Sequence, residues 1–470
     1  MREKLKYTIK KIISGTCFLP VMALFTVVKL KKYSPELTKK NNIKILLFSE
    51  ERCEQDVQVI LNQGFTIYSF PTNWVCLINS LFIDSSVKQS IDTYFLEEDR
   101  EVLESRERHI KYISSLMSIV SRIIKVRCAI TPAMHYIREY PWAAACKKAN
   151  ISFIAVHKEL TTLSDWQVPI RVERWKNRKF KFLGSKLCVV NNVAKKLIAE
   201  SEILPSKDIV VIGLLRMDNI LHEACQLRRP PTPVKPVVTL FSFGHLTGPF
   251  EEERPCRSHY FSLNDDYGFV KLFCRVHSSF VEAALRNPNV QFNIQLKNNA
   301  EWWVKEINAV IQKEHGTFQF HWLSENKINQ YNQTEDMYFC VRDGVTIKDI
   351  PNCHIIKKWA PKLIHESNVV IALNSTVVLE SCVLRRRTII PVFEEAITKY
   401  KKHIYFSEYL DLFMVANSKE NLIRFIEDNC YEFKESELDQ DRLNKLCERY
   451  LGFSDGKAGE RLNEVISQVA

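Results

Sequence analysis

Residues 368–393 read NVVIALNSTVVLESCVLRRRTIIPVF, and this stretch decides the predicted fold. The apolar run at 369–373 predicts a buried strand, the polar residues 374–376 turn the chain into a helix, and a second apolar run at 388–392 predicts the next strand. A strand–helix–strand unit of this kind places the start of its helix at the carboxyl edge of a parallel sheet. Open α/β folds bind their ligands at that edge.

The start of this helix favours an anion. Its backbone N–H groups, its macrodipole and the hydroxyls of Ser375 and Thr376 all attract negative charge. Thr376 and Glu380 are four residues apart and therefore share a helix face. We predict a nucleotide site, with phosphate on the hydroxyls and amides and a ribose hydroxyl on Glu380. The alternative is an ordinary serine-capped helix that carries a solvated glutamate.

Composition indicates a folded protein of more than one domain. The chain has 470 residues, of which 46% are hydrophobic and 26% charged. Its net charge of +11 is compatible with a membrane surface, an anionic substrate or nucleic acid, and does not choose among them. The 14 cysteines are scattered without zinc-type spacing, which indicates reduced thiols in a cytosol-facing protein. We expect no metal and no cofactor besides a nucleotide-linked substrate.

The N-terminal segment, residues 1–41, combines an apolar run with basic flanks. Lysines and an arginine precede the run at 12–28, and Lys29, Lys31 and Lys32 follow it. This pattern predicts a helix associated with an anionic membrane, at the cytoplasmic face of the inner or plasma membrane. A signal anchor and a helix that simply packs on the domain are the alternatives.

The rest of the chain alternates apolar strands with helices and contains one clear break. Residues 42–226 form one such series and residues 237–470 a second, which ends in a helical tail. Between them, residues 227–236 contain four prolines, which excludes a helix or a central strand and indicates a linker. The fold class predicted is α/β, with two Rossmann-like, doubly wound domains.

Several stretches resemble proteins of capsule and surface-polysaccharide biosynthesis. The N-S-T-x-x-x-E core within 369–393 looks like their C-terminal nucleotide-binding signature. Residues 154–159 (IAVHKE) and 213–218 (GLLRMD) resemble a strand end and an interdomain turn of their first domain, and residues 241–245 (FSFGH) and 268–277 the start of their second. The resemblance implies the GT-B architecture, two domains facing across a cleft. It also implies a glycosyltransferase that builds a cell-surface glycan, with a CMP-activated acidic sugar among its donors.

Glycosyl transfer needs a base for the acceptor hydroxyl and positive charge or dipoles at the leaving phosphate. His157 and Glu159 follow a strand of the first domain, the acceptor side, and either could be the base. We expect His157 to titrate near neutrality, whereas Glu159 would need a raised pKa. A loop histidine and a solvated glutamate are the alternatives.

Further candidates come from other strand ends. His245 and Lys297 could meet the donor phosphates, and the nucleobase could stack on Trp359. Arg216 and Asp218 are expected to pair or to join the domains, beside the acceptor. Each also has an ordinary structural alternative.

Other functions remain open at this level. One is a second GT-B chemistry, either a sugar-nucleotide epimerase or a polyol-phosphate transferase with a CDP-linked donor. Another is a non-catalytic protein that binds glycan or nucleic acid. The basic and aromatic stretch 166–181 offers a patch for such binding, but a solvated face explains it equally well. We expect a nucleotide-sugar donor, a glycan or glycolipid acceptor and no nucleic acid, and the sequence leaves the oligomeric state open.

Overall fold

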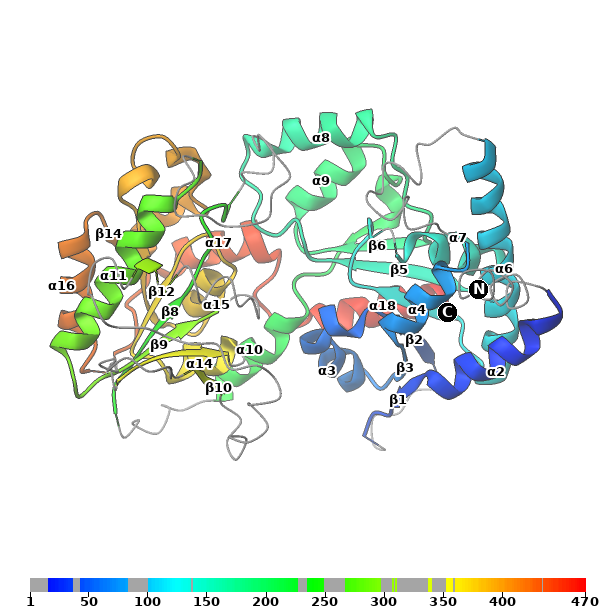
Figure 1. The fold of residues 1–470 in the computed structure, drawn as a ribbon, viewed down its shortest axis with the longest axis horizontal. Coiled ribbons are helices and arrows are strands. Elements are labelled where there is room, and N and C mark those ends of the chain that lie inside the picture. The colour runs from blue at the N-terminus through cyan, green and yellow to red at the C-terminus, as the bar shows by residue number, and fades with distance from the viewer. Residues whose placement is uncertain are drawn as a thin grey trace, which may run out of the picture. The chain divides into compact units, whose positions relative to one another are not determined.

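The computed structural model describes residues 16–36, 43–82, 100–136, 138–226, 235–248, 267–296, 307, 309–310, 337–339, 352–357, 360–432 and 434–470. The chain divides into two compact units. The first consists of Met1–Asn219 with Glu448–Ala470, and the second of Ile220–Cys447. Each unit contains a seven-stranded, mainly parallel sheet (Figure 1).

The sheet of the first unit has the order β1-β3-β2-β4-β5-β6-β7. β1 pairs antiparallel with β3, and the other neighbouring strands are parallel. The carboxyl ends of β2 to β7 therefore lie at one edge. The strands are β1 (Lys31–Tyr33), β2 (Lys44–Phe48), β3 (Thr66–Phe70), β4 (Cys128–Thr131), β5 (Ser152–His157), β6 (Lys186–Val189) and β7 (Ile209–Val211).

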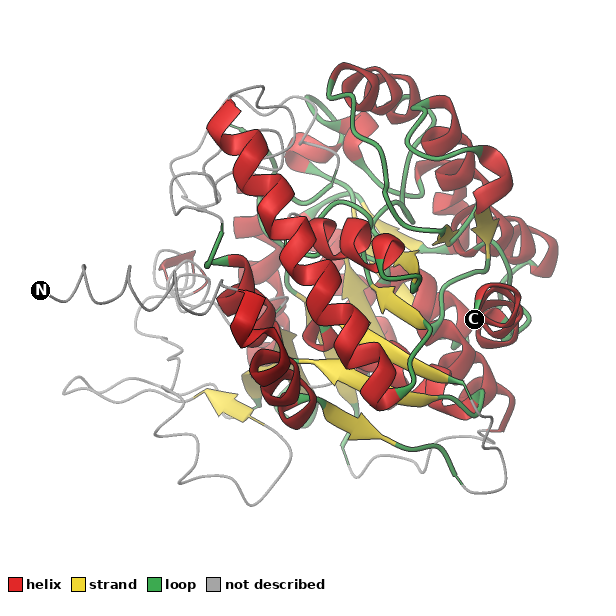
Figure 2. Ribbon diagram, turned by 90° about the vertical axis from the view of Figure 1, so that its right-hand side faces the viewer, coloured by secondary structure: helices red, strands yellow, loops and turns green. Residues whose placement is uncertain are grey.

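Alternation along β2 divides the core of the first unit into two layers. Leu46 and Phe48 belong to one layer, in which the Phe48 ring stacks on Phe70 at 5.2 Å between centroids. Ile45 and Leu47 belong to the other. Helices cover the sheet, as Figure 2 shows for the face toward the viewer. Since side chains on both faces of β2 are buried, its sequence is a continuous apolar run.

Helices and short 3-10 turns connect these strands. The elements are η1 (Thr16–Phe18), α2 (Leu19–Lys29), η3 (Glu50–Arg52), α3 (Glu54–Asn62), α4 (Thr72–Asn79), α6 (Arg100–Ile124), α7 (Tyr140–Lys148), α8 (Gln167–Asn177), α9 (Asn192–Glu200), η5 (Ser206–Asp208), α10 (Arg216–Gln226) and α18 (Ala458–Val469). The chain leaves the first unit within α10, and it returns within α17 (Gln440–Leu451).

The C-terminal tail corrects the predicted domain division, which places it entirely in the second domain. Leu462, Val465 and Ile466 of α18 belong to the same core layer as Ile45 of β2. Asp218 fixes the start of this helix, because its two carboxylate oxygens accept the N–H groups of Ala458 (3.0 Å) and Gly459 (2.7 Å). Residues 448–470 therefore complete the first unit.

The same contact gives Asp218 a structural role. Both of its carboxylate oxygens serve the N-terminus of α18 within the first unit. Arg216, the other residue of the expected pair, is the first residue of α10. Capping of α18 explains the position of Asp218, and it requires neither contact with an acceptor substrate nor a link to the second unit.

The sheet of the second unit has the order β10-β11-β9-β8-β12-β13-β14. Its described neighbours are parallel except for β10, which pairs antiparallel with β11. The strands are β8 (Val237–Phe241), β9 (Gln291–Gln295), β10 (Met337–Phe339), β11 (Cys353–Lys357), β12 (Val369–Ala372), β13 (Arg387–Pro391) and β14 (Met414–Ala416). The connecting elements are α11 (Val270–Arg286), α14 (Ala360–Glu366), α15 (Val377–Val383), η7 (Glu394–Ala396), η8 (Lys401–His403), η9 (Ser407–Leu412) and α16 (Lys419–Asn429).

Some predictions fall on residues outside the described ranges. These are Lys297, Trp359, most of the linker at 227–236 and much of the N-terminal segment 1–41. Within that segment the structure has the helix α2, whose residues Leu19, Met22, Ala23 and Thr26 are buried. Among the described helices, none combines the length and apolar character needed to cross a membrane.

Candidate functional site

His157 is the last residue of β5, so it lies at the carboxyl edge of the first sheet. Its imidazole is buried, with 1% exposed, and burial lowers its pKa to about 3 because the charged form loses hydration. The ring of His135 lies edge-on to it, 5.4 Å between centroids, and contributes to this lowering of the pKa. Neither ring nitrogen of His157 has a hydrogen-bond partner in the described part of the chain. The structure thus holds a neutral imidazole beneath the sheet edge.

Glu159 lies two residues beyond β5 and forms the centre of a polar cluster. Its Oε2 is 3.1 Å from Nε2 of His135, and its Oε1 accepts the hydroxyl of Tyr136. Burial alone would raise the pKa of this carboxyl. The hydrogen bond and charge of His135, together with the Tyr136 hydroxyl, outweigh burial and lower the pKa to about 2. Glu159 is therefore ionised throughout the physiological range.

His135 is the functional candidate that the sequence analysis misses. It lies in the loop after β4, three residues past Pro132, and its side chain remains 27% exposed. Besides Glu159, its ring contacts the edges of His157 and Trp175. A signal for it exists, because the apolar run at 126–130 predicts a strand, and the loop after a parallel strand comes to the same sheet edge as His157.

These pKa shifts change the assignment of the base. An efficient general base has a pKa near the working pH. The pKa of His157 is lowered, so the expectation that it titrates near neutrality is wrong. The pKa of Glu159 is also lowered, so this carboxylate lacks the raised pKa that a base role would need. His135 is the third titratable side chain of this cluster. A carboxylate orients its ring at Nε2, and its Nδ1 is buried without a hydrogen-bond partner in the described part of the chain.

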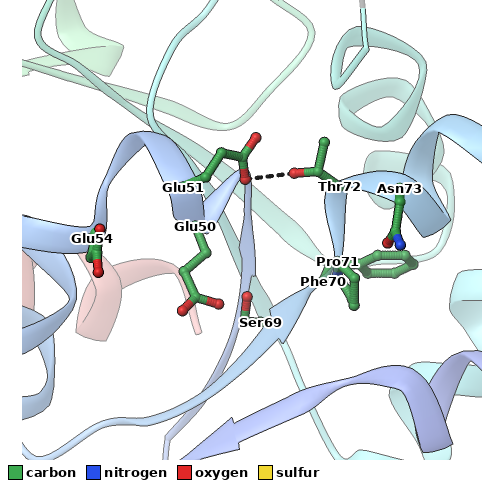
Figure 3. Close-up of a pocket in the computed structure, with 8 residues that line it drawn as sticks. All are labelled: Glu50, Glu51, Glu54, Ser69, Phe70, Pro71, Thr72 and Asn73. Carbon is green, nitrogen blue, oxygen red and sulfur yellow. Dashed lines mark hydrogen bonds between the residues drawn. The ribbon is translucent and has the colours of Figure 1, made fainter. Parts of the chain in front are cut away.

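A pocket of about 620 Å³ opens at the same edge of the sheet, at the carboxyl ends of β2 and β3. Figure 3 shows carboxylates, hydroxyls and an amide in its lining, together with the apolar side chains of Phe70 and Pro71. Thr72 donates to Glu51 at 2.6 Å, and Glu50 lies beside Ser69. The lining residues are Glu50, Glu51, Glu54, Ser69, Phe70, Pro71, Thr72 and Asn73.

Arg138 links the pocket to the loop that carries His135. Its guanidinium lies 3.3 Å from Glu51 on the pocket wall and 2.9 Å from buried Glu139. Ser49, which follows β2 with a φ of 53°, bridges Arg138 and Glu139 through its hydroxyl. The polar residues that follow β3, β2, β4 and β5 therefore line one edge of the sheet, in that order.

In the second unit, Asn374 fixes the turn after β12. It has a φ of 49°, the left-handed conformation that asparagine tolerates. Its amide nitrogen donates to the carbonyls of Thr247 (3.2 Å) and His403 (2.8 Å), and its amide oxygen accepts the N–H of Tyr405 (2.8 Å). Asn374 thereby holds the loops after β8 and β13 against this turn. Three hydrogen bonds of the Asn374 side chain therefore fix the first residue of the predicted N-S-T-x-x-x-E motif.

The predicted nucleotide residues follow this turn on α15, a helix of seven residues. Ser375 accepts the N–H of Val377 at 3.3 Å, and Thr376, which precedes the helix, makes no side-chain cap bond. Glu380 is 3% exposed. The alternative of a solvated glutamate is therefore wrong, because a carboxylate buried to this extent must have polar compensation.

His245 is also buried, in the loop after β8. Its carbonyl accepts the N–H of Phe269 at 2.8 Å, which ties the loop to the start of α11. Nearby, Ser242 bonds to His277 Nε2 at 2.9 Å, and burial lowers the pKa of His277 to about 4. The carboxyl edge of β8 thus carries polar groups close to the turn at Asn374.

Two of the three arginines after α15 make side-chain hydrogen bonds to later helices, and the third is buried. Arg385 donates to Gln440 and Arg387 to Asn429, both at 2.7 Å. Arg386 is buried, and burial lowers its pKa to about 10. These contacts fasten the start of β13 to the helical tail of the second unit.

In the described ranges, no three His, Cys, Asp or Glu side chains are grouped so that they could hold a metal ion. No protein-family model matches the chain, and no curated protein sequence matches it significantly.

Several solved structures have a similar fold. UDP-GlcNAc 2-epimerase from Neisseria meningitidis, bound to UDP-GlcNAc, is 11% identical, with a TM-score of 0.43 over 91% of this chain and 99% of that chain. UDP-GlcNAc 2-epimerase from Methanocaldococcus jannaschii is 11% identical, with a TM-score of 0.44 over 91% and 99%. The wall teichoic acid polymerase TagF is 11% identical, with a TM-score of 0.44 over 99% and 97%. Likeness at this level assigns neither a family nor an activity.

Proposed function

We propose that this protein is a GT-B-type glycosyltransferase that moves a sugar from a nucleotide-activated donor to a hydroxyl of a glycan or glycolipid. The observation that carries the proposal is the pair formed by His135 and Glu159. A partly exposed imidazole has its Nε2 3.1 Å from an ionised carboxylate at the carboxyl edge of a parallel sheet, and its buried Nδ1, which has no partner among the described residues, is the nitrogen we propose takes the proton once the acceptor reaches it. This is a geometry suited to taking a proton from a hydroxyl.

His135 is the proposed base, and Glu159 is the residue that positions it. The acceptor oxygen bonds to the anomeric carbon of the donor as the bond from that carbon to the nucleotide phosphate breaks. The acceptor proton passes to His135, and the nucleotide leaves with the bonding electrons. Glu159 then stabilises the imidazolium, and neutral His157 packs against the same ring without adding a competing charge.

The pocket of Figure 3 is the proposed acceptor site. Glu50, Glu51 and Glu54 present oxygens that accept sugar hydroxyls, and the Asn73 amide can also donate. Hydroxyl-rich ligands suit such a lining better than anions do, since three carboxylates would repel negative charge. An uncharged stretch of glycan is therefore the acceptor we propose for this pocket.

The donor nucleotide is proposed to bind the second unit, at the turn held by Asn374. Ser375 and Thr376 would bind phosphate and Glu380 the ribose, with His245 nearby. Lys297 and Trp359, which lie outside the described residues, keep their proposed roles at the phosphate and the base. The proposed reaction uses no metal ion.

A thermal-shift screen with CMP, CDP, UMP, UDP and GDP tests donor binding. A nucleotide that binds only the folded protein should stabilise it by about 2.7 kcal/mol at a hundred times its dissociation constant. Glu380→Gln should weaken this effect, and Ser375→Ala provides a milder second variant. Glu420→Gln, on the exposed surface of α16, is the matched control and should respond as the wild type does. If no nucleotide stabilises the wild type, the proposal loses its donor site.

A further inference from the structure

The helix α2 has apolar residues on both faces, but the described residues of its own unit bury only one of them. Leu19, Met22, Ala23 and Thr26 form the buried face. This face packs against α6, as Figure 1 shows, and the Thr26 hydroxyl accepts the indole N–H of Trp74 at 3.1 Å. A helix that is apolar all round is normally buried all round. The outer face of α2 is therefore a candidate interaction surface.

The outer face is a continuous apolar patch. Val21, Leu24, Phe25 and Val28 follow the i, i+3, i+4, i+7 spacing of one helix face, and they are 45%, 58%, 54% and 79% exposed. With Phe18, they account for five of the twelve large apolar side chains that are exposed in the described part of the chain. Scattered exposed apolar residues are ordinary, whereas a row along one helix marks an interaction surface.

The charges around the patch indicate what covers it. Lys29 is the last residue of the helix, Lys31 and Lys32 come directly after it, and all three are exposed. The first 33 residues of the chain contain eight lysines and arginines and a single acidic residue, Glu3. A partner for this surface must therefore accept apolar side chains and attract positive charge at the same time. An anionic lipid bilayer does both.

We propose that α2 lies in the plane of an anionic membrane, with Val21, Leu24, Phe25 and Val28 inserted among the lipid chains. The buried face of the helix fixes this orientation, because Ala23 and Thr26 are held against the protein. Lys29 and Lys32 then lie level with the lipid headgroups. The attachment does not depend on which reaction the protein performs.

Vesicle sedimentation with the full chain tests this proposal. Vesicles of phosphatidylcholine, with and without phosphatidylglycerol, are the probes. Leu24→Asn with Phe25→Asn should lower the partition coefficient about a hundredfold, roughly tenfold for each large side chain that no longer inserts. Ile123→Asn with Leu285→Asn, two exposed apolar residues on other helices, is the matched control and should partition as the wild type does.

A second pair of substitutions tests the electrostatic part. Lys29→Gln with Lys32→Gln should lower binding to the anionic vesicles by about fivefold for each charge removed. Binding to phosphatidylcholine alone should stay unchanged. Point substitutions are preferable to deleting the segment, because deletion would also strip Leu19 and Met22 from the core.

Three results would overturn the proposal. The first is wild-type vesicle binding by the Leu24 and Phe25 double variant. The second is a large drop in its thermal midpoint, since that would mean that another part of the chain covers the face. The third is a wild-type dimer that the double variant converts to monomers, which would assign the face to a second copy of the chain.

Discussion

The neutral, buried state of His157 makes a quantitative prediction about acid stability. Unfolding exposes the imidazole and returns its pKa from about 3 to the ordinary value of 6.5. Below pH 6.5 the unfolded chain therefore binds a proton that the folded chain refuses, so the contribution of this residue to stability is full above pH 6.5. It decreases as the pH falls toward 3. Between pH 8 and 4.5 the loss amounts to about 2.7 kcal/mol.

The substitution His157→Asn removes this titration. The variant should lose about 2.7 kcal/mol less stability than the wild type over the same interval, whatever its stability at neutral pH. Hydrogen exchange of peptides that contain β5, followed through a urea series at each pH, reports the unfolding of the first unit. His222→Asn, at an exposed position, is the control and should keep the wild-type pH dependence. Equal losses in wild type and His157→Asn would refute a neutral buried imidazole.

Three further changes test other contacts. Asp218→Asn should destabilise the first unit by about 1 kcal/mol, because an amide offers one acceptor oxygen for the two N–H groups at the start of α18; urea unfolding measures this, and an unchanged midpoint would contradict the cap. Gly452→Ala should cost at least about 2 kcal/mol, since the added Cβ would lie 2.1 Å from a backbone oxygen at a φ of +77°. Gly213→Ala is the control: Gly213 also has a positive φ, but the nearest atom to a Cβ added there is 3.5 Å away. Equal unfolding midpoints for the two variants would contradict the clash at Gly452. Glu159→Gln should lower kcat about tenfold to a hundredfold with little change in KM, and an unchanged kcat would remove its positioning role.

The two sheets could be predicted because parallel strands are buried on both faces. The apolar runs predict strands at 66–70 and 237–241, and the structure has them at those residues. β1 and β14 are not predicted. β1 has three residues, two of them lysines, so it offers no apolar run to detect. β14 is equally short and follows a series of 3-10 turns.

The sequence did not predict to which unit the C-terminal helix α18 belongs. The apolar periodicity of α18 predicts a helix but does not say which core it completes. The deciding contacts are those of Asp218 with Ala458 and Gly459, which lie some 240 positions further along the chain. Contacts between distant segments of this kind leave no local pattern.

The candidate site was predictable in position more than in chemistry. The strand end at His157 and Glu159 marks the correct edge of the sheet, because side chains after parallel strands gather there. Their pKa values depend on burial and on His135, which a linear sequence does not display. In the second unit the same limit applies to Glu380, whose burial follows from packing around α15.

The most direct test of the proposed function is nucleotide release from a panel of nucleotide sugars, with and without a hydroxyl-bearing glycan acceptor. The wild type should release nucleotide only when acceptor is present, and the sugar should appear on the acceptor. His135→Asn should lower this rate at least about a hundredfold. Sugar interconversion without nucleotide release would instead indicate an epimerase, and CMP released from a CDP-linked polyol would indicate a phosphotransferase. Either result, or an undiminished rate in His135→Asn, would contradict the account.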